Sequence, residues 1–171
     1  MAVSGQARSI SIRNATTNDA PEILACLHAA FAPYRDSYSR AAYLDTVLTP
    51  DTLQRRLACM QVLVAQTSSG QIVGSIACQA INQKEGHIRG MAVLPTCQST
   101  GVAAKLLAHA EAELRRQNCT CITLDTTAPL ERAMRFYEKF GFHRSGKITD
   151  FFGMPLFEFA KLLPSSGTPA E

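Results

Sequence analysis

Hydrophobic residues recur along this chain with a spacing of two in some segments and of three to four in others. Residues 9–13 (SISIR) alternate apolar and polar side chains, which is the pattern of a half-buried β-strand. Asp19, with Glu22 three residues later, then carries the signal of a helix start. The apolar positions that follow share one helical face: Ile23, Leu24, Leu27, Ala30 and Phe31. Residues 33–60 predict two short helices, the second beginning at Asp51.

The rest of the chain continues this alternation of strands and helices. The expected elements are a hairpin over 61–66 and 71–81 with its turn at 68–70, a strand over 87–94 after a turn at 84–86, a helix over 99–118, a strand over 121–126, a helix over 127–140 that Gly141 ends, and strands over 142–148 and 154–163. This order predicts an α/β domain. We expect a single domain over residues 1–171, with a core of about 10–162 and a frayed tail over 164–171.

Composition narrows the class of protein. A chain of 171 residues, 46% of them hydrophobic, can bury a core of its own. The net charge of +3 comes from scattered Lys and Arg, which argues against a nucleic-acid partner. Since no apolar stretch suits a signal peptide or a membrane span, we expect a cytoplasmic protein with no membrane partner. The six cysteines form no CxxC pair, so reduced thiols are expected, with neither a disulfide nor a metal.

One strand-to-helix connection has the composition of an anion-binding loop. In residues 91–107 (MAVLPTCQSTGVAAKLL) a strand ends at Pro95, small residues follow, and the long helix begins. Backbone N–H groups in the first turn of a helix lack intrahelical partners, and with the helix dipole they favour a phosphate. Gly101 would let the backbone approach that ligand, although on this loop alone a packing role is the preferred interpretation. Neither a P-loop ending nor a GxGxxG run is present, which disfavours triphosphatases and dinucleotide oxidoreductases.

Two motifs in this order resemble those of the GNAT superfamily of acyl-CoA-dependent N-acyltransferases. The cofactor motif of that family, Gln/Arg-x-x-Gly-x-Gly/Ala after a strand that ends in Val-x-Pro, is matched by residues 93–95 and by Gln98, Gly101 and Ala103. A second family signature, Phe/Leu-Tyr-Glu-x-x-Gly-Phe, is matched by residues 136–142 (FYEKFGF). The resemblance extends over nearly the whole chain.

The resemblance implies a GNAT fold, which is a mixed, mostly antiparallel twisted sheet of about six to seven strands, flanked by about four helices and splayed between strands 4 and 5. It also implies acetyl-CoA as a cosubstrate in that gap, with no metal. Met91 and Val93 would pair with the pantetheine arm, and the Met91 N–H would polarise the thioester carbonyl. The implied cofactor contacts are Met91, Ala92, Val93, Gln98, Ser99, Thr100, Gly101, Val102 and Ala103.

The family pattern further implies that Tyr137 is the acid. Its hydroxyl would point at the CoA sulfur and protonate the departing thiolate, whose thiol has an ordinary pKa near 8.5. A purely structural role, with the ring packed beside Leu130 and Met134, is the alternative, and we expect the ring to serve both purposes.

A second group must accept a proton, because an amine resembling that of Lys has a pKa of about 10.4. His87, four residues before Met91, matches a position where some family members carry a catalytic Glu, and a histidine near pKa 6.5 accepts a proton at neutral pH. Glu85 on the same strand face would orient His87 or act through water. An ordinary surface histidine is an equal alternative. Asp125 is a third candidate, either attracting a cationic amine or capping the next helix.

The phosphate loop departs from the family pattern in its charge. Residues 98–100 supply no basic side chain, and Leu130 stands where an Asn is common. Four basic residues downstream of the loop are candidates to compensate: Lys105, Arg132, Arg135 and Lys139. The acceptor pocket is expected from residues 31–60, where three tyrosines are candidates to line it: Tyr34, Tyr38 and Tyr43.

These features together predict an N-acetyltransferase that moves acetyl from acetyl-CoA to a primary amine by direct attack in a ternary complex. A small-molecule amine is the preferred acceptor. The alternatives are a protein N-terminal or lysine acetyltransferase and, from another class, a CoA-binding regulatory domain without turnover. Family members often pair, so a homodimer is an option.

Overall fold

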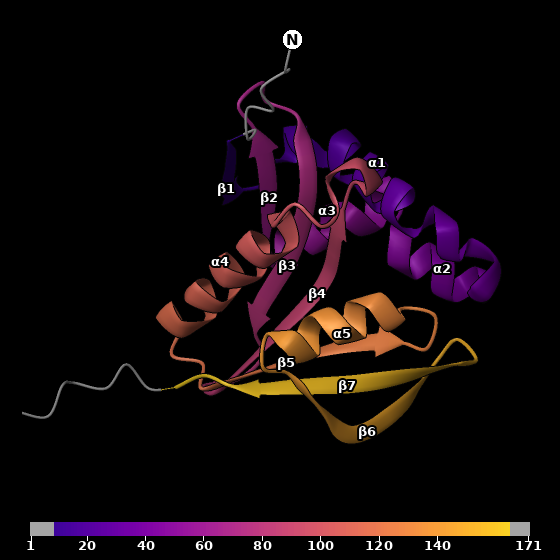
Figure 1. Ribbon diagram of the computed structural model, residues 1–171, viewed down its shortest axis with the longest axis vertical. Helices are drawn as coiled ribbons and strands as arrows, with labels where there is room; N and C mark the ends of the chain where they lie inside the picture. The colour runs from indigo at the N-terminus through magenta and orange to yellow at the C-terminus, as the bar shows by residue number, and fades with distance from the viewer. Residues whose placement is uncertain (1–8, 165–171) are drawn as a thin grey trace, which may run out of the picture.

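A seven-stranded twisted sheet runs through the protein, seen in a computed structural model that describes residues 9–164 (Figure 1). Its spatial order is β1-β2-β3-β4-β5-β7-β6, and every neighbouring pair is antiparallel except β4 and β5. The strands are β1 Ile10–Asn14, β2 Gln61–Thr67, β3 Ile72–Ala80, β4 Glu85–Val93, β5 Cys121–Thr127, β6 His143–Phe151 and β7 Met154–Leu162. The predicted tail lies outside the described residues from 165 onward.

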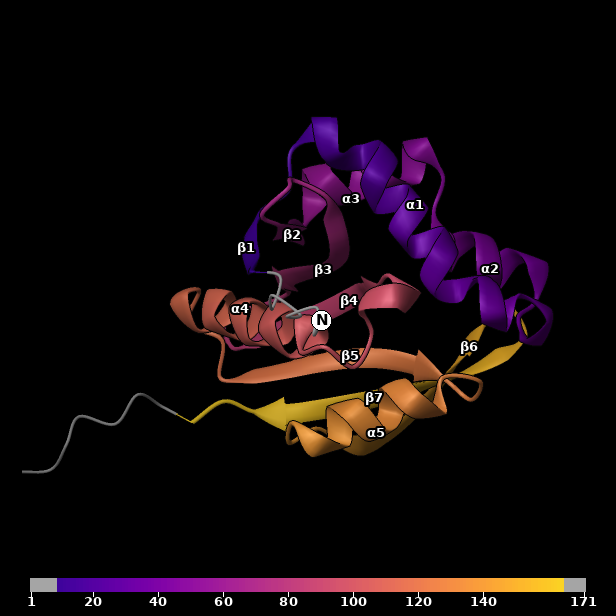
Figure 2. The same ribbon diagram turned by 45° about the horizontal axis from the view of Figure 1, so that its top comes forward.

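Five α-helices cover the two faces of the sheet (Figure 2). They are α1 Ala20–Phe31, α2 Arg40–Val47, α3 Pro50–Cys59, α4 Val102–Arg116 and α5 Glu131–Lys139, with short 3-10 segments η1 Thr17–Asp19, η2 Ala32–Ser37 and η3 Pro95–Cys97. One face carries α1 and α3, and the other carries α4 and α5. The predicted fold is confirmed, with five helices in place of about four. No helix within the described part of the chain is long and apolar enough to cross a bilayer.

The sheet opens between β4 and β5, as predicted. These parallel strands pair at only four positions, from Glu85 opposite Cys121 to Ile88 opposite Leu124, and then diverge. A β-bulge begins where that pairing ends, because the register between β3 and β4 shifts after Arg89. Gly90 within the bulge has a φ of 65°, a conformation that glycine adopts without strain. The bulge therefore bends β4 at the mouth of the gap.

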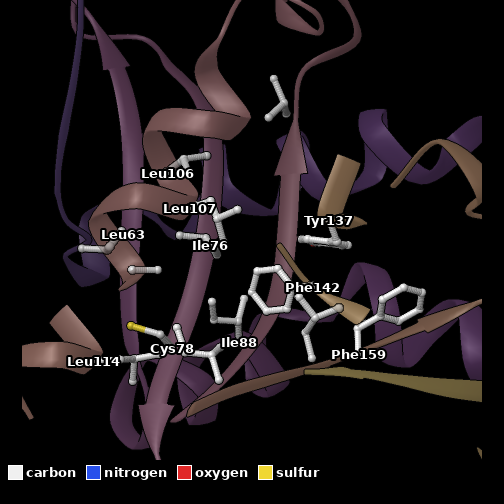
Figure 3. Close-up of a cluster of buried hydrophobic side chains, with 14 of the residues drawn as sticks. Leu63, Ile76, Cys78, Ile88, Leu106, Leu107, Leu114, Tyr137, Phe142 and Phe159 are labelled. Carbon is white, nitrogen blue, oxygen red and sulfur yellow. The ribbon is translucent and has the colours of Figure 1, made fainter. Parts of the chain in front are cut away.

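Two hydrophobic clusters hold the helices on the sheet. The larger one joins α4 and α5 to the strands and includes Ile88, Leu106, Phe142 and Phe159, all at most 1% exposed (Figure 3). The smaller one joins α1 and α3 to the opposite face. Side chains alternate along a strand, so burial of Ile88 on the α4–α5 side turns the neighbouring His87 toward the α1–α3 side.

Gly86 corrects one prediction. It was expected in a turn over residues 84–86, but it lies inside β4, and the turn comes earlier, where the Asn82 side chain accepts from the N–H groups of Lys84 and Glu85. A Cβ atom at Gly86 would lie 2.7 Å from both terminal carbons of Leu114 on α4. The glycine therefore allows α4 to pack closely on β4.

The start of α3 also differs slightly from the prediction. The helix begins at Pro50, and Thr49 rather than Asp51 provides the boundary. The Thr49 hydroxyl accepts from the Thr52 N–H at 3.3 Å, while the Thr52 hydroxyl accepts from the Thr49 N–H at 2.8 Å. This reciprocal capping box satisfies two donors that the helix would otherwise leave unpaired.

Candidate active site

A cavity of about 770 Å³ occupies the gap between the diverging ends of β4 and β5. Helix α5 and the start of α4 bound it on one face of the sheet, and η2, α2 and α3 contribute residues from the other. Such a volume lies in the range of small-molecule sites. Residues from both faces of the sheet therefore line one cavity.

The loop that precedes α4 presents backbone donors to this cavity. Ser99 and Gly101 adopt positive φ angles of 62° and 90°. The Lys105 N–H donates to the Gly101 carbonyl at 3.1 Å, so the N–H groups of residues 102–104 precede the first intrahelical bond and have no acceptor within the helix. A Cβ atom built on Gly101 would meet nothing within 4 Å. Open space therefore lies beside these donors, as an anion site requires.

Arg132 supplies the positive charge that the loop sequence lacks. From α5 its guanidinium donates to the Gln98 side-chain oxygen at 3.0 Å and to the Ser99 hydroxyl at 2.6 Å. Lys139 also lines the cavity, whereas Arg135 lies beside Glu131 at 3.8 Å and Lys105 does not reach the lining. Of the four basic candidates, Arg132 is the one in contact with the loop.

The inner edge of β4 is partly free. The Leu94 N–H donates to the Val73 carbonyl on β3 at 2.8 Å. In an antiparallel ladder, alternate residues face the same neighbour, so the polar backbone groups of Ala92 also face β3 and those of Val93 face the gap. The Val93 carbonyl accepts from the Gln98 side chain at 3.1 Å. The N–H of Val93 is then the polar backbone group of this residue that remains for a ligand in the cavity.

Tyr137 lies at the boundary between the core and the cavity. Tyr137 is 8% exposed, and its ring makes edge contacts with Phe136 and Phe142, whose centroids are 5.4 and 5.7 Å away. Figure 3 shows Tyr137 and Phe142 in the buried cluster. No protein group within residues 9–164 hydrogen-bonds with its hydroxyl, and burial raises its pKa above the usual value of 10. Tyr137 therefore stays protonated at neutral pH and can donate to a ligand. The buried Thr126 hydroxyl on β5 likewise has no partner among the described residues.

His87 is oriented from the neighbouring strand. Its Nδ1 atom lies 2.9 Å from the Thr123 hydroxyl oxygen, and that hydroxyl donates to a Glu85 carboxylate oxygen at 3.0 Å. Since the single hydroxyl proton goes to Glu85, Thr123 accepts from Nδ1–H. The Nε2 atom is then the unprotonated nitrogen. Glu85 thus lies behind His87, outside the cavity lining.

Asp125 faces His87 across the opening gap. One carboxylate oxygen lies 3.6 Å from His87 Nε2. Asp125 is not the helix cap considered from the sequence, because α5 begins at Glu131 and Leu130 occupies its N-cap position. Burial lowers the pKa of His87, opposed by attraction to Asp125. Burial likewise raises the pKa of Asp125, opposed by attraction to His87. The separation exceeds a direct hydrogen bond, and a ligand donor placed between the two groups could contact both.

Most residues expected at the site line the cavity. Those that do are His87, Met91, Ala92, Val93, Gln98, Ser99, Gly101, Ala103 and Tyr137, together with Tyr34 and Tyr38. Thr100 and Val102 do not, because the Thr100 hydroxyl donates to the Cys97 carbonyl and Val102 is buried in the core. Tyr43 instead packs edge-on against Tyr38, with centroids 6.2 Å apart. The Thr127 hydroxyl donates to the Tyr38 hydroxyl at 3.2 Å.

Three lining or supporting residues were not predicted from the sequence: Arg56, Thr123 and Thr126. Threonines are ordinary in strands, so nothing distinguishes Thr123 or Thr126 until the strand partners are known. Arg56 lies on α3 near other charged residues, and an arginine in such a segment is usually part of a solvent-exposed helix face. The structure places it in the cavity wall, beside Gly90 in the bulge of β4.

Comparison with known proteins decides the family. The sequence model of the acetyltransferase (GNAT) family matches residues 23–142. The chain belongs to the GNAT family of acetyltransferases. Among curated proteins, none matches this sequence.

Solved structures share the GNAT fold at low sequence identity. The PaiA N-acetyltransferase from Thermoplasma acidophilum, in complex with coenzyme A, aligns with a TM-score of 0.75 and 18% identity over 91% of this chain and 99% of that chain. The ribosomal-protein-S18-alanine N-acetyltransferase from Escherichia coli aligns with a TM-score of 0.75 and 18% identity over 95% and 99%. YncA from Salmonella typhimurium, a putative acetyltransferase with acetyl-CoA, aligns with a TM-score of 0.69 and 20% identity over 95% and 98%.

Proposed function

We propose that this GNAT protein transfers acetyl from acetyl-CoA to the primary amine of a small molecule by direct attack in a ternary complex. The observation that carries the proposal is the placement of a candidate base and a candidate acid on opposite faces of one cavity. His87 and Asp125 enter from the α1–α3 side, and Tyr137 enters from the α5 side.

Three features of the α4–α5 side support acetyl-CoA as the cosubstrate. The free amides at the start of α4 and the Arg132 guanidinium would hold the pyrophosphate. The Val93 N–H and the unpartnered Thr126 hydroxyl offer donors along the gap for the amides of the pantetheine arm. Bound acetyl-CoA supplies the thioester whose acyl group is transferred.

The acceptor amine would bind between His87 and Asp125. An ammonium group can donate to His87 Nε2 and to the Asp125 carboxylate, which are 3.6 Å apart. His87 Nε2 would then take one proton and leave a neutral nucleophile. The Glu85–Thr123 pair keeps the other nitrogen protonated and would stabilise the charge that His87 gains.

Tyr137 would complete the transfer by donating its phenolic proton to the departing thiolate. The proton that the attacking nitrogen loses as the amide forms would then return to the phenolate. Its hydroxyl has no competing protein partner within residues 9–164, and burial keeps it protonated. The Met91 N–H, at the bulge of β4, would stabilise the developing oxyanion. Much of the rate would come from holding the amine and the thioester in line.

The acceptor side favours a small molecule. Tyr34 on η2 and Tyr38, the residue that follows η2, line the cavity, and the Tyr38 hydroxyl accepts from the Thr127 hydroxyl at the end of β5. These aromatic side chains would narrow the space open to an acceptor on the α1–α3 side.

Thiol release during incubation with acetyl-CoA and a mixed acceptor panel tests the proposal. The panel holds small primary amines, peptides with free N-termini, and lysine peptides with blocked N-termini. We expect release with small amines to exceed release with either peptide class. Greater release with peptides would favour a protein acetyltransferase, and CoA binding without release above background would favour the regulatory alternative.

A further inference from the structure

The guanidinium of Arg56 is an unpaired cation in the wall of the cavity. It reaches the lining from α3, on the side that we assign to the acceptor. Among residues 9–164, no carboxylate pairs with it and no carbonyl or hydroxyl oxygen accepts from it. Asp45, which lines the same wall, lies 3.4 Å from Arg89 instead. Of these two arginines, Arg89 therefore has a carboxylate partner and Arg56 has none among the described residues.

Burial makes this arrangement unfavourable without a ligand. Burial, helped by the neighbouring positive charge of Arg89 and opposed by a smaller effect of Asp45, lowers the pKa of Arg56 to about 10. Arginine ordinarily titrates above pH 12. The side chain remains charged at neutral pH, and a charge withdrawn from water without a partner is costly. An anion delivered by a ligand would remove that cost.

The guanidinium of Arg56 lies close to the backbone of β4 at its bulge. A Cβ atom at Gly90 would lie 2.4 Å from Nη1 of Arg56 and 3.4 Å from its Cζ, so the planar group rests against the bare backbone of the strand. His87 belongs to the same strand, three residues earlier. At about 3.3 Å of rise per residue, the two groups are within the span of one small molecule.

From this geometry we infer that the acceptor is an amine that also carries a carboxylate, which Arg56 binds while the amine lies between His87 and Asp125. The inference rests on the proposed acetyl transfer and adds the class of acceptor. A guanidinium offers two parallel N–H donors that match the two oxygens of a carboxylate. Arg89, tied to Asp45, contributes positive potential without being the direct ligand.

Matched acceptor pairs test this inference on the full-length protein. Each amino acid, α-amino or ω-amino, is compared with a partner that lacks the negative charge, its amide or the corresponding alkylamine. The measured quantity is the ratio of kcat/KM for the amino acid to kcat/KM for its partner without the carboxylate. We expect a ratio of at least roughly 10 for the best pair, since a charged hydrogen bond typically contributes this much or more.

Two substitutions on α3 separate the role of Arg56 from general electrostatics. Arg56→Gln should reduce the ratio to near 1, and Arg56→Lys should retain only part of it, because an ammonium is a point charge. Arg55→Gln removes the same charge from the adjacent exposed residue, outside the main cavity, and should leave the ratio unchanged. Thermal unfolding of each variant checks that it folds.

The outcomes distinguish this inference from the proposed function. Turnover of amines without a carboxylate, with no preference for amino acids, would overturn the inference alone. A preference for amino acids that survives Arg56→Gln would do the same. Absence of thiol release with every acceptor would overturn the proposed function, and the inference with it.

Discussion

The Nδ1 atom of His87 lies 2.9 Å from the hydroxyl oxygen of Thr123, 36 residues further along the chain. The contact exists because the two residues are directly paired in the parallel register of β4 and β5. This pair lies near the end of the β4–β5 ladder, because the strands separate after the next pair, Ile88 and Leu124. The candidate base is therefore anchored where the cavity begins.

Loss of the Thr123 hydroxyl should impair the base without removing it. We expect Thr123→Val to lower kcat roughly 3- to 30-fold while the KM for acetyl-CoA stays within twofold, because Nδ1 loses the partner that fixes the tautomer. Thr123→Ser should recover most of the rate, since it restores the hydroxyl. Thr120→Val, at an exposed position just before the same strand, is the control. An equal loss in the serine variant would assign Thr123 to packing alone.

The pH dependence of the reaction should report the buried histidine. Burial lowers the pKa of His87 below 6.5, so the proton-accepting form dominates at neutral pH and is lost only as the pH falls below that value. With an acceptor whose own amine stays protonated throughout this range, kcat/KM should be flat near pH 7 and decline in acid. His87→Gln should lower the plateau and abolish that decline. A decline of unchanged shape in His87→Gln would mean that another group titrates.

Tyr137→Phe tests the acid. We expect kcat to fall roughly 10- to 1000-fold while the dissociation constant of acetyl-CoA changes less than about threefold, because the ring and its packing on Phe142 are retained. Stopped-flow turnover and calorimetric binding measure the two quantities separately. A variant as fast as the wild type would remove the hydroxyl from the mechanism.

Packing of α4 on β4 predicts a coupled effect on stability. Gly86→Ala places a methyl group against Leu114, which is completely buried, and should destabilise the protein by about 1–3 kcal/mol through overpacking. Leu114→Ala alone should cost about 2–5 kcal/mol because it leaves a cavity. In the double variant the new methyl group occupies part of that space, so the combined loss should be smaller than the sum. Strict additivity in urea unfolding would contradict the contact.

The fold could be predicted from the sequence, and the loop that we propose as the cofactor site could be identified there, because both depend on local patterns. The strand before Pro95, the small residues after it and Gly101 at the start of α4 are read directly from consecutive positions. Gly141 also ends α5 as expected, with a φ of 90°. Local signals were misleading at Gly86. A glycine near polar residues is typical of a turn, but here the absence of a side chain leaves room for Leu114.

The other half of the site depends on how distant segments meet. Contact of Thr123 with His87 follows from the register of two strands separated by a helix, which no local pattern specifies. Arg56 lies in the cavity wall beside Gly90, a residue of a distant strand, and the carboxylate that we propose as its partner would belong to a ligand. Arg132 was one of four equivalent candidates until the position of α5 was known.

Calorimetric titration with CoA tests the central claim most directly, because every proposed role depends on a diphosphate held at the start of α4. Folded wild-type protein should bind CoA, and Arg132→Gln should weaken binding roughly 5- to 50-fold through loss of a charged contact. Arg135→Gln, which removes the same charge from an exposed position on the same helix, should bind like the wild type. If folded wild-type protein took up no CoA or acetyl-CoA at millimolar concentration, the account would be wrong.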